Sequence, residues 1–286
     1  MARVIVTGGS GKLGRAVVAD LVENGWQVTV FDRAVSADPI PGVHHLPVDL
    51  TDYGQTLDAV LGVEERHDSI AAIVHLAAIP APGLMPDQAT FANNMNGSFH
   101  VVTAARRAGI RKIVWASSET VLGLPFDTPP PYVPVDEEYT PRPESTYSLV
   151  KTLEEELARQ LCRWDPTLSM IGLRFSNVMA PQDYAGFGDF QDDPRARKWN
   201  LWGYIDARDG AQAVRRALDH DSPGAEVFII AAADTVMTAP NDALLDDVFP
   251  DVPRRDGIGE HTTLLSIDKA RRVLGYSPEH SWRDQG

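Results

Sequence analysis

The chain has 286 residues, of which 43 % are hydrophobic and 23 % charged, and its formal net charge is −14. This length provides for one large or two unequal domains around a packed core, and the acidic balance excludes a general nucleic-acid-binding role, which needs a basic face. The single cysteine, Cys162, excludes an internal disulfide, and without CxxC pairs we expect no metal site.

No apolar run in the sequence approaches the roughly 20 residues of a membrane span, so we expect no membrane partner. The first residues, Met1 to Arg3, lead directly into a predicted strand and leave no room for a signal peptide. We therefore expect a cytoplasmic, globular protein.

Short β-branched runs alternate with helical segments in the first half of the chain. The runs predict buried strands at Arg3–Thr7, Gln27–Asp32, Val43–Val48, Ile70–Leu76 and Lys112–Ala116. Between several of them the apolar residues have helical spacing, as in Leu13-Val17-Leu21 and Phe99-Val102-Ala105. This alternation predicts an α/β fold, with a doubly wound parallel sheet that is covered on both faces.

Regular elements return in the second half, around one long irregular segment. That segment, Asn177–Tyr204, is rich in glycine, proline, acidic and aromatic residues, which favours a functional loop over a linker. In the tail, Ser266 is the expected N-cap of a short helix and Gly275 its C-terminal stop. The other predicted elements are helices at Leu149–Leu161 and Ala207–Asp219 and strands at Met170–Leu173 and Glu226–Ile230.

A glycine-rich turn follows the first predicted strand and opens the first helix. Its sequence is Thr7-Gly8-Gly9-Ser10-Gly11-Lys12-Leu13-Gly14. Gly8 and Gly11 let the turn form and the backbone approach a pyrophosphate, while Gly14 lets the helix pack close to the sheet. The helix N-terminus then presents free N–H groups to the phosphates. The turn therefore predicts a dinucleotide cofactor.

Acidic residues at two later strand ends refine the choice of cofactor. Asp32 ends the second strand, 18 residues after Gly14, near the spacing of a carboxylate that binds a ribose 2′-hydroxyl. Such a carboxylate repels a 2′-phosphate and favours NAD, although the adjacent Arg33 could bind that phosphate and leaves NADP open. Asp49-Leu50, after the third strand, flanks the adenine, or Asp49 caps the helix that follows.

Tyr147 and Lys151 lie at the start of a predicted helix. Residues four apart share one helical face, so the phenol and the ammonium project to the same side. A tyrosine has a pKa near 10 and needs a nearby cation to act as a base at neutral pH. Ser117 and Ser118 follow the strand Lys112–Ala116, at the edge where open α/β sheets bind ligands. A serine hydroxyl there can hold a substrate oxygen while the tyrosine moves the proton.

Together these motifs resemble the extended short-chain dehydrogenase/reductase family, also called the NAD-dependent epimerase/dehydratase family. The resemblance implies a Rossmann fold and a catalytic trio of Ser118, Tyr147 and Lys151. It also implies that Asn94 is an active-site asparagine that supports the lysine and a water, and that His75 is structural. The matching stretches are Thr7–Gly14, His75–Ala78, Asn93–Gly97, Trp115–Gly123, Pro143–Lys151, Leu173–Val178, Tyr204–Asp209 and Asp268–Pro278.

Motif and resemblance together give the expected cofactor site and domain division. We assign residues 1–174 to the dinucleotide-binding core and residues 175–286 to a small C-terminal substrate-binding part that returns to the core and does not fold separately. The expected cofactor-binding residues are Gly8, Gly11, Lys12, Leu13, Asp32, Arg33, Asp49, Leu50, Leu76, Ala77, Ala78, Tyr147 and Lys151.

Three departures from the family pattern narrow the substrate. Asn177 and Asp206 are only 29 residues apart, which is too short for the insertion that holds a nucleotide diphosphate in nucleotide-sugar enzymes. Glu119-Thr120 after Ser118 is an incomplete version of the dehydratase acid pair, and Leu122 replaces a usual aromatic. The compact chain looks more like the uronate dehydrogenases, which oxidise the anomeric carbon of a free sugar acid.

A sugar acid needs a cation for its carboxylate, preferably an arginine. Arg195, Arg197 and Lys198 in the irregular loop and Arg174 before it are candidates, or the loop cations are simply solvated charges. Trp199 and Trp202 either stack on a sugar or anchor the loop. A neutral aldose needs none of these cations. The expected substrate-binding residues are Ser117, Ser118, Arg174, Ser176, Asn177, Arg197 and Trp202.

We therefore expect an NAD-dependent oxidoreductase that transfers hydride from a hydroxyl of a sugar or sugar acid, at C1, to NAD. The alternative is a nucleotide-sugar 4-epimerase that retains its NAD. A non-catalytic dinucleotide sensor is disfavoured because Tyr147 and Lys151 are both present. The resemblance also implies a homodimer, paired through helices around residues 88–108 and 148–162.

Overall fold

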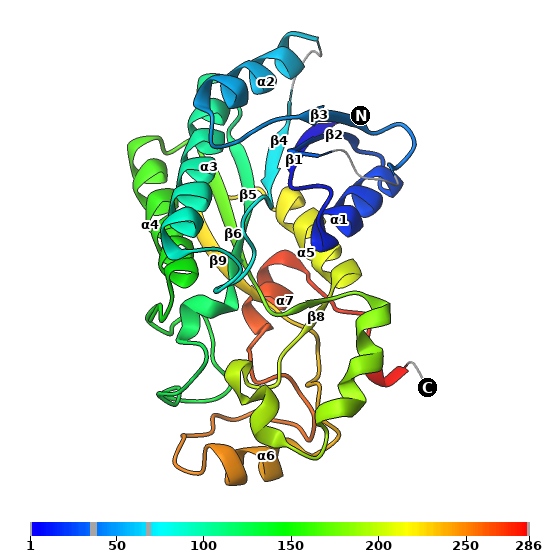
Figure 1. The fold of residues 1–286 in the computed structure, drawn as a ribbon, viewed down its shortest axis with the longest axis vertical. Helices are drawn as coiled ribbons and strands as arrows, with labels where there is room; N and C mark the ends of the chain where they lie inside the picture. The colour runs from blue at the N-terminus through cyan, green and yellow to red at the C-terminus, as the bar shows by residue number, and fades with distance from the viewer. Residues whose placement is uncertain (1, 35–38, 67–69, 285–286) are drawn as a thin grey trace.

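The computed structural model describes residues 2–34, 39–66 and 70–284. Seven parallel strands form one sheet in the order β3-β2-β1-β4-β5-β6-β9 (Figure 1). The chain first moves outward from β1 to β3 and then from β4 to β9, so the expected doubly wound sheet is confirmed. The strands are β1 Arg3–Thr7, β2 Gln27–Asp32, β3 His44–Pro47, β4 Ala72–His75, β5 Lys112–Ser118, β6 Ser169–Phe175 and β9 Gly224–Ile230.

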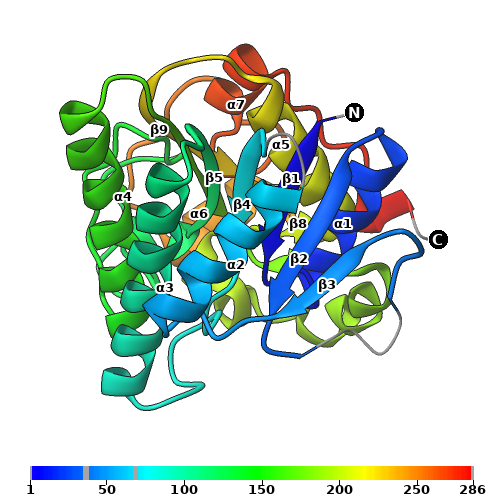
Figure 2. The same ribbon diagram turned by 90° about the horizontal axis from the view of Figure 1, so that it is seen from above.

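Helices cover both faces of this sheet. Helices α1 (Lys12–Glu23) and α5 (Ala207–Asp219) pack on one face, and α2 (Tyr53–Arg66), α3 (Asp87–Arg107) and α4 (Thr146–Trp164) cover the other (Figure 2). Alternate residues of a strand serve the two layers. Val4 and Val6 of β1 join the cluster under α1, and Ile5 joins the cluster under α3. Because both faces are buried, β1, β2 and β4 are apolar along nearly their whole length, whereas the edge strand β3 is only partly buried.

A smaller region extends from the carboxyl edge of the sheet (Figure 1). Its buried side chains, Trp202, Tyr204 and Phe249 among them, belong to the same cluster as the strand residues Val6 and Val114. The domain division at residue 174 stays an interpretation. The elements of this region are the parallel pair β7 Val178–Met179 and β8 Ile205–Asp206, the 3-10 helices η2 Pro181–Phe190 and η3 Pro194–Asn200, and α6 Asn241–Val248.

Three further short elements complete the described chain. The 3-10 helix η1 (Glu119–Leu122) directly follows β5, η4 (Trp282–Asp284) lies near the C-terminus, and α7 (Asp268–Leu274) packs against β9 and α5. In the part of the chain that the structure describes, no helix has the length and apolar character needed to span a bilayer.

Two predicted boundaries differ from the structure in informative ways. Helix α4 begins at Thr146 rather than Leu149, because Ser145 and Ser148 form a reciprocal capping box at its start. The expected N-cap Ser266 is wrong by one residue, since α7 is capped by Ile267 without a side-chain bond. Ser266, one residue earlier, donates its N–H to Val135 O at 2.7 Å, while its hydroxyl accepts the N–H of Asp268 at 3.4 Å. Gly275 does end α7, in the left-handed conformation.

In the sheet, the space beside one glycine is filled by the side chain of a neighbouring strand. Gly172 of β6 lies opposite Trp115 of β5, and a Cβ atom on Gly172 would come within 2.6 Å of the indole ring. Both residues lie in the interior, where close packing leaves little room for the ring to move.

We predict that Gly172→Ala lowers the free energy of unfolding by about 1–3 kcal/mol, the usual cost of overpacking a well-packed core. Chemical denaturation followed by tryptophan fluorescence measures this change. Gly186→Ala is the control, because a Cβ at Gly186 meets nothing within 4 Å. Equal stability of the two variants would contradict the packing argument.

Candidate active site

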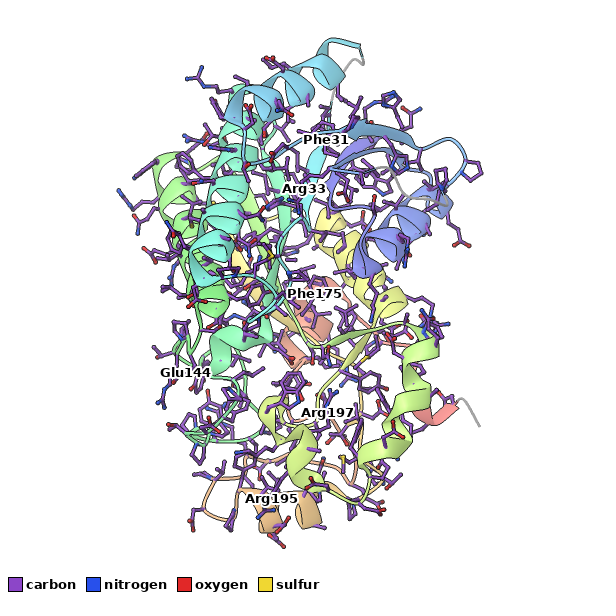
Figure 3. All side chains as sticks on the ribbon, viewed as in Figure 1. Phe31, Arg33, Glu144, Phe175, Arg195 and Arg197 are labelled. Carbon is purple, nitrogen blue, oxygen red and sulfur yellow. The ribbon has the colours of Figure 1, made fainter. Side chains whose placement is uncertain are left out.

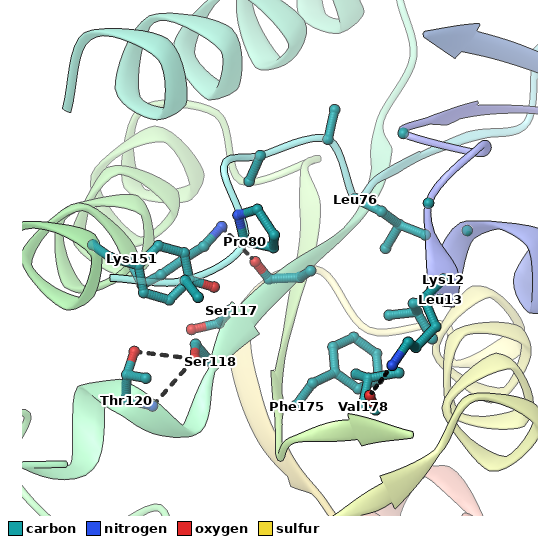
Figure 4. Close-up of a pocket in the computed structure, with 18 of the residues that line it drawn as sticks. Lys12, Leu13, Leu76, Pro80, Ser117, Ser118, Thr120, Lys151, Phe175 and Val178 are labelled. Carbon is teal, nitrogen blue, oxygen red and sulfur yellow. Dashed lines mark hydrogen bonds between the residues drawn. The ribbon is translucent and has the colours of Figure 1, made fainter. Parts of the chain in front are cut away.

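A cavity of about 1090 Å³ lies along the carboxyl ends of the strands, across the point where the strand order reverses between β1 and β4. The glycine turn after β1 forms one end of it, and the end of β5 and the start of α4 form the other (Figure 4). This is the edge at which open α/β sheets bind ligands. The cavity therefore brings the two predicted sites into one continuous pocket.

The glycine turn is built by very close backbone approaches. Gly8 has a φ of 72°, and a Cβ on it would lie 2.6 Å from Ala77 N. A Cβ on Gly14 would lie 2.1 Å from Gly8 O, so only glycine lets α1 pack this near the turn. The N-cap residue of α1 is Gly11, which has no side chain to bond the first N–H groups of the helix. The first N–H groups of α1 thus face the pocket without a side chain to cap them, which fits a bound phosphate.

The structure brings the acidic residues of the cofactor end to the same pocket. Asp32 accepts hydrogen bonds from Ser10 N at 3.1 Å and from Arg33 N at 2.7 Å, and Asp32 and Arg33 both line the cavity. Asp49 lines it as well and bonds to Thr51, whose hydroxyl and N–H lower the pKa of the carboxyl. The residue that bonds the first turn of α2 is Asp52, so capping is not the role of Asp49.

The predicted loop contacts beside β4 also lie in the cavity wall, since Leu76, Ala77 and Ala78 line it. His75 lies beneath them and is fully committed, with Nδ1 2.7 Å from Thr7 Oγ1 and Nε2 3.0 Å from Ser98 Oγ. Burial and the nearby Lys151 charge lower its pKa to about 3. A neutral imidazole with a hydrogen bond at each ring nitrogen agrees with the structural role expected for His75.

Tyr147 and Lys151 occupy the buried side of the first two turns of α4. The capping box at Ser145 fixes where α4 begins and thereby which side chains face the sheet. Lys151 Nζ lies 5.8 Å from the centre of the Tyr147 ring and donates to Ala116 O at 2.8 Å. Ser118 ends β5 and accepts bonds from Thr120 N and Thr120 Oγ1 (Figure 4). Ser118, Tyr147 and Lys151 all line the cavity.

The electrostatic balance at Tyr147 is finer than a tyrosine–lysine pair alone suggests. Burial raises the pKa of Tyr147 above its ordinary value, and the charges of Glu154 and Glu119 raise it further. The Lys151 charge and a hydrogen bond from Ser118 act in the opposite direction, but they do not outweigh burial. The sequence pattern did not reveal this opposition, because it depends on carboxylates brought in by packing.

Lys12 links the glycine turn to β7 and η2. Its Nζ lies 2.5 Å from Asp183 Oδ2 and donates to Val178 O at 3.3 Å, although Lys12 itself belongs to the glycine turn. Ser176, Asn177 and Val178 line the cavity beside this contact, as does Trp199.

Four predicted site residues do not reach the cavity wall. Asn94 is buried and exchanges two hydrogen bonds with the backbone of Ile79, while its neighbour Asn93 lines the cavity. Arg174 is buried in a two-pronged pair with Glu155, at 2.9 and 2.8 Å. Trp202 is fully buried and donates to Pro194 O at 2.7 Å, so it anchors the loop.

The remaining loop cations are also engaged elsewhere. Arg197 is the fourth predicted site residue that does not line the cavity. It stacks on the rings of Phe190 and Trp199 and donates to Gly203 O at 3.2 Å. Arg195 pairs with Asp247 near α6, far from Phe175 at the end of β6 (Figure 3). Lys198 lies 3.5 Å from Asp127. Among the described residues that line the cavity, the cations are Lys12, Arg33 and Lys151, and none belongs to η2 or η3.

Glu119 is the site residue that the sequence analysis undervalued. It is 3 % exposed, lines the cavity, and accepts hydrogen bonds from Ser176 Oγ at 2.5 Å and Asn200 Nδ2 at 3.2 Å. Burial raises its pKa to about 7, against these hydrogen bonds and the Arg197 charge. Its place directly after Ser118 was the available signal, but only folding shows that its carboxyl joins β6 to η3.

The comparison with known protein families identifies the chain. Residues 4–231 match the family described as the NAD dependent epimerase/dehydratase family. The chain belongs to this family. The resemblance found in the sequence is thereby confirmed, and so is NAD dependence at the level of the family.

Curated relatives of this family member are UDP-glucose 4-epimerases. One from Oryza sativa subsp. japonica is 30 % identical over 215 residues, which cover 71 % of this chain and 56 % of the relative. One from Bacillus subtilis is 29 % identical over 210 residues, covering 71 % and 59 %. The match spans less than two thirds of the length of these relatives.

Solved structures support the fold over nearly the whole chain. A short-chain dehydrogenase/reductase superfamily protein from Agrobacterium tumefaciens with bound NAD superposes with a TM-score of 0.72 at 26 % identity, covering 98 % of this chain and 94 % of that one. A mutated uronate dehydrogenase gives 0.69 at 22 % identity, covering 99 % and 85 %. The Rossmann-type fold is confirmed, and the neighbours of the chain include both dehydrogenases and epimerases.

We predict that Glu119 makes the stability of the protein depend on pH. Its pKa is about 7 when folded and near 4.5 when unfolded, so between these values the folded state holds a proton that the unfolded state releases. Stability from this group is therefore present at low pH and lost as pH rises toward about 7. Chemical denaturation across this range measures the slope, which is at most about 1.4 kcal/mol per pH unit.

Glu119→Gln removes the ionising group but keeps the shape of the side chain. The difference in unfolding free energy between wild type and this variant is expected to change with pH below about 7 and to level off above it. Glu144→Gln is the control, since Glu144 also lines the cavity but is well exposed. An unchanged difference across the range would contradict the role of Glu119.

Proposed function

We propose that the pocket transfers hydride between a hydroxyl-bearing carbon of a sugar and NAD, with Tyr147 as the proton acceptor. One observation carries this proposal: Tyr147 and Lys151 lie one turn apart on the buried side of α4, facing Ser118 in a cavity that continues to the glycine turn. Epimerases and dehydrogenases of the family share this step, so it does not depend on the net reaction.

The cofactor end fits NAD on the chemistry of its residues. The N-terminus of α1 and the turn around Gly11 bind the pyrophosphate, Asp32 binds the adenosine ribose, and Asp49 and Leu50 flank the adenine. NAD is favoured over NADP, because the Asp32 carboxylate repels a 2′-phosphate. Bound nicotinamide supplies the hydride acceptor.

The protein's own groups then handle the proton. Tyr147 removes the proton from the substrate hydroxyl as the hydride leaves the same carbon, which leaves a carbonyl product. Ser118 donates a hydrogen bond to the oxygen on which negative charge develops. Lys151 stabilises the phenolate of Tyr147 and binds the nicotinamide ribose, and in reduction the same groups return the proton.

The composition of the substrate end favours a neutral sugar over a sugar acid. Arg174, Arg195 and Arg197, the expected partners of a carboxylate, are engaged with Glu155, Asp247 and aromatic rings. The described wall of the cavity contains Glu119, Glu144 and Trp199 instead. A carboxylate placed there would find no cationic partner from η2 or η3, which is costly. We therefore propose a free, neutral aldose, oxidised at C1.

The second candidate is a nucleotide-sugar 4-epimerase that retains its NAD. The curated relatives support this candidate better than the dehydrogenase, because those with 28–30 % identity are UDP-glucose 4-epimerases. In this reaction the carbonyl formed in the first step is reduced again from the opposite face, and no NADH is released. The short excursion between Asn177 and Asp206 is the feature that weighs against it.

The homodimer expected from the resemblance stays a prediction. It gains support from large apolar side chains that are exposed on α3 and α4, namely Phe91, Phe99, Leu149, Leu153 and Trp164. The cytoplasmic location and the sugar partner stay proposals as well.

We predict NADH release from free neutral aldoses, and much less from uronates of the same configuration. Initial rates of NADH formation, with NAD and a panel of both classes, measure this difference. UDP-, GDP- and dTDP-sugars are tested in the same assay and by calorimetry. Tight binding and 4-epimerisation of a UDP-sugar without NADH release would reject the dehydrogenase and establish the second candidate.

With any active substrate, we predict that Tyr147→Phe lowers turnover by about 10²–10⁴-fold, the usual contribution of a general acid–base group. NAD affinity, measured by calorimetry, should stay within a few-fold, because only one hydroxyl is lost. Tyr139→Phe is the control, since Tyr139 does not line the cavity. Retention of most activity in Tyr147→Phe would contradict the proposed proton transfer.

A further inference from the structure

Lys151 has a buried acidic partner that the proposed proton transfer does not use. Its Nζ donates to Glu154 Oε2 at 2.9 Å, and the side chains of Lys151 and Glu154 are 4 % and 3 % exposed. A second hydrogen bond of Nζ goes to Ala116 O, at 2.8 Å. Two of the three ammonium protons are thus directed to fixed oxygens. The third is left for the Tyr147 side, which lies within cation–π distance.

The other oxygen of Glu154 is held just as firmly. Ser98 Oγ of α3 donates to Glu154 Oε1 at 2.6 Å and lies 3.0 Å from His75 Nε2 of β4. His75 Nδ1 in turn meets Thr7 Oγ1 of β1 at 2.7 Å. Each member of this row is less than 9 % exposed. Glu154 therefore cannot swing away from Lys151 without breaking a chain of bonds that runs into the sheet.

The adjacent carboxylate, Glu155, has a different partner. It pairs with Arg174 and accepts a bond from Ser117 Oγ at 2.6 Å. Helix α4 thus carries two successive buried acids, and the fold supplies one cation to each. The Lys151–Glu154 pair is the one that touches the proposed catalytic group.

The pair has consequences for charge at both members of the tyrosine–lysine couple. Burial lowers the pKa of Lys151, but the charge and hydrogen bond of Glu154, together with the charges of Tyr147 and Glu155, outweigh burial and leave the pKa above its ordinary value. The same carboxylate raises the pKa of Tyr147. The other ionisable groups that act on the pair are Glu155 on α4, Glu119 on η1 and the neutral His75 on β4.

We propose that Glu154 is a positioning residue that keeps the buried Lys151 ammonium charged and aimed between Ala116 O and Tyr147, and so sets the pH range in which the couple works. The inference rests on the proposed function for the meaning of that range. The charge and geometry of Lys151 themselves are open to direct measurement.

The test follows the Lys151 ammonium by NMR of protein labelled with ¹³C and ¹⁵N lysine, with Lys151→Arg to assign the signal. In Glu154→Gln, we expect the titration of Lys151 to shift to lower pH, because burial then acts without the carboxylate that opposes it. Calorimetry with NAD at about pH 7 and pH 9 gives a second readout. The affinity of the variant is expected to fall several-fold more than that of wild type between these two values.

Glu156→Gln is the matched control. It removes a carboxylate from the same helix, but Glu156 bonds the half-buried Gln160 and the exposed Arg159 rather than Lys151. We expect both readouts to match wild type in this variant. Glu154→Asp keeps the charge on a shorter side chain, so the Lys151 titration should return most of the way to wild type. A merely structural role of Glu154 does not predict this recovery.

Lys151 signals that stay alike in Glu154→Gln and Glu156→Gln over the whole pH range would overturn the inference. If Glu154→Gln does not fold, Ser98→Ala provides the second variant, since it frees one oxygen of Glu154 while keeping the charge. A smaller downward shift of the Lys151 titration is then expected. The absence of any shift would count against the inference. Failure of the proposed function would show instead as an active Tyr147→Phe enzyme.

Discussion

The steric constraint on which the rest of the structure depends is the close approach of α1 to the glycine turn that precedes it. Any side chain on Gly14 would collide with Gly8 O, and any side chain on Gly8 would collide with the backbone of Ala77. These two contacts fix the direction of α1, keep its first N–H groups open to the cavity, and join β1 to the segment after β4. The cavity exists across the strand reversal because three pieces of backbone meet there without side chains between them.

At the other end of the cavity, the chemistry depends on how buried charges are matched. Helix α4 presents Tyr147, Lys151, Glu154 and Glu155 to the interior, an arrangement that is costly unless each charge has a partner. β5, β6 and α3 provide these partners through Ala116 O, Arg174 and Ser98. This explains why Arg174 is not free for a substrate. Its conformation is set by Glu155, and releasing it would leave a buried carboxylate alone.

The sequence predicted those features that depend on local spacing. The glycine turn, the strands and the Tyr147–Lys151 face follow from neighbours along the chain, and the fold agrees with them. Four residues that were also assigned to the site do not line the cavity, namely Asn94, Arg174, Arg197 and Trp202. Residue type alone does not show which partner a side chain meets after folding. For the same reason, the sequence analysis did not assign Glu119 to the site and did not single out Glu154: their partners, Asn200 and Ser98, lie 81 and 56 positions away.

The short pair β7–β8 gives the substrate wall a particular freedom. Val178 pairs with Ile205 and Met179 with Asp206 in a separate two-stranded sheet, so the segment between β7 and β8 begins and ends at neighbouring points. Since the entropic cost of a longer loop grows slowly, the exposed parts of this segment can lengthen or shorten at little cost. Its buried side chains Tyr184, Phe187 and Trp202 are held in the core cluster that contains Val6. The pocket wall can therefore vary only between these fixed side chains, whereas the cofactor end, with its glycines in mutual contact, accepts almost no change.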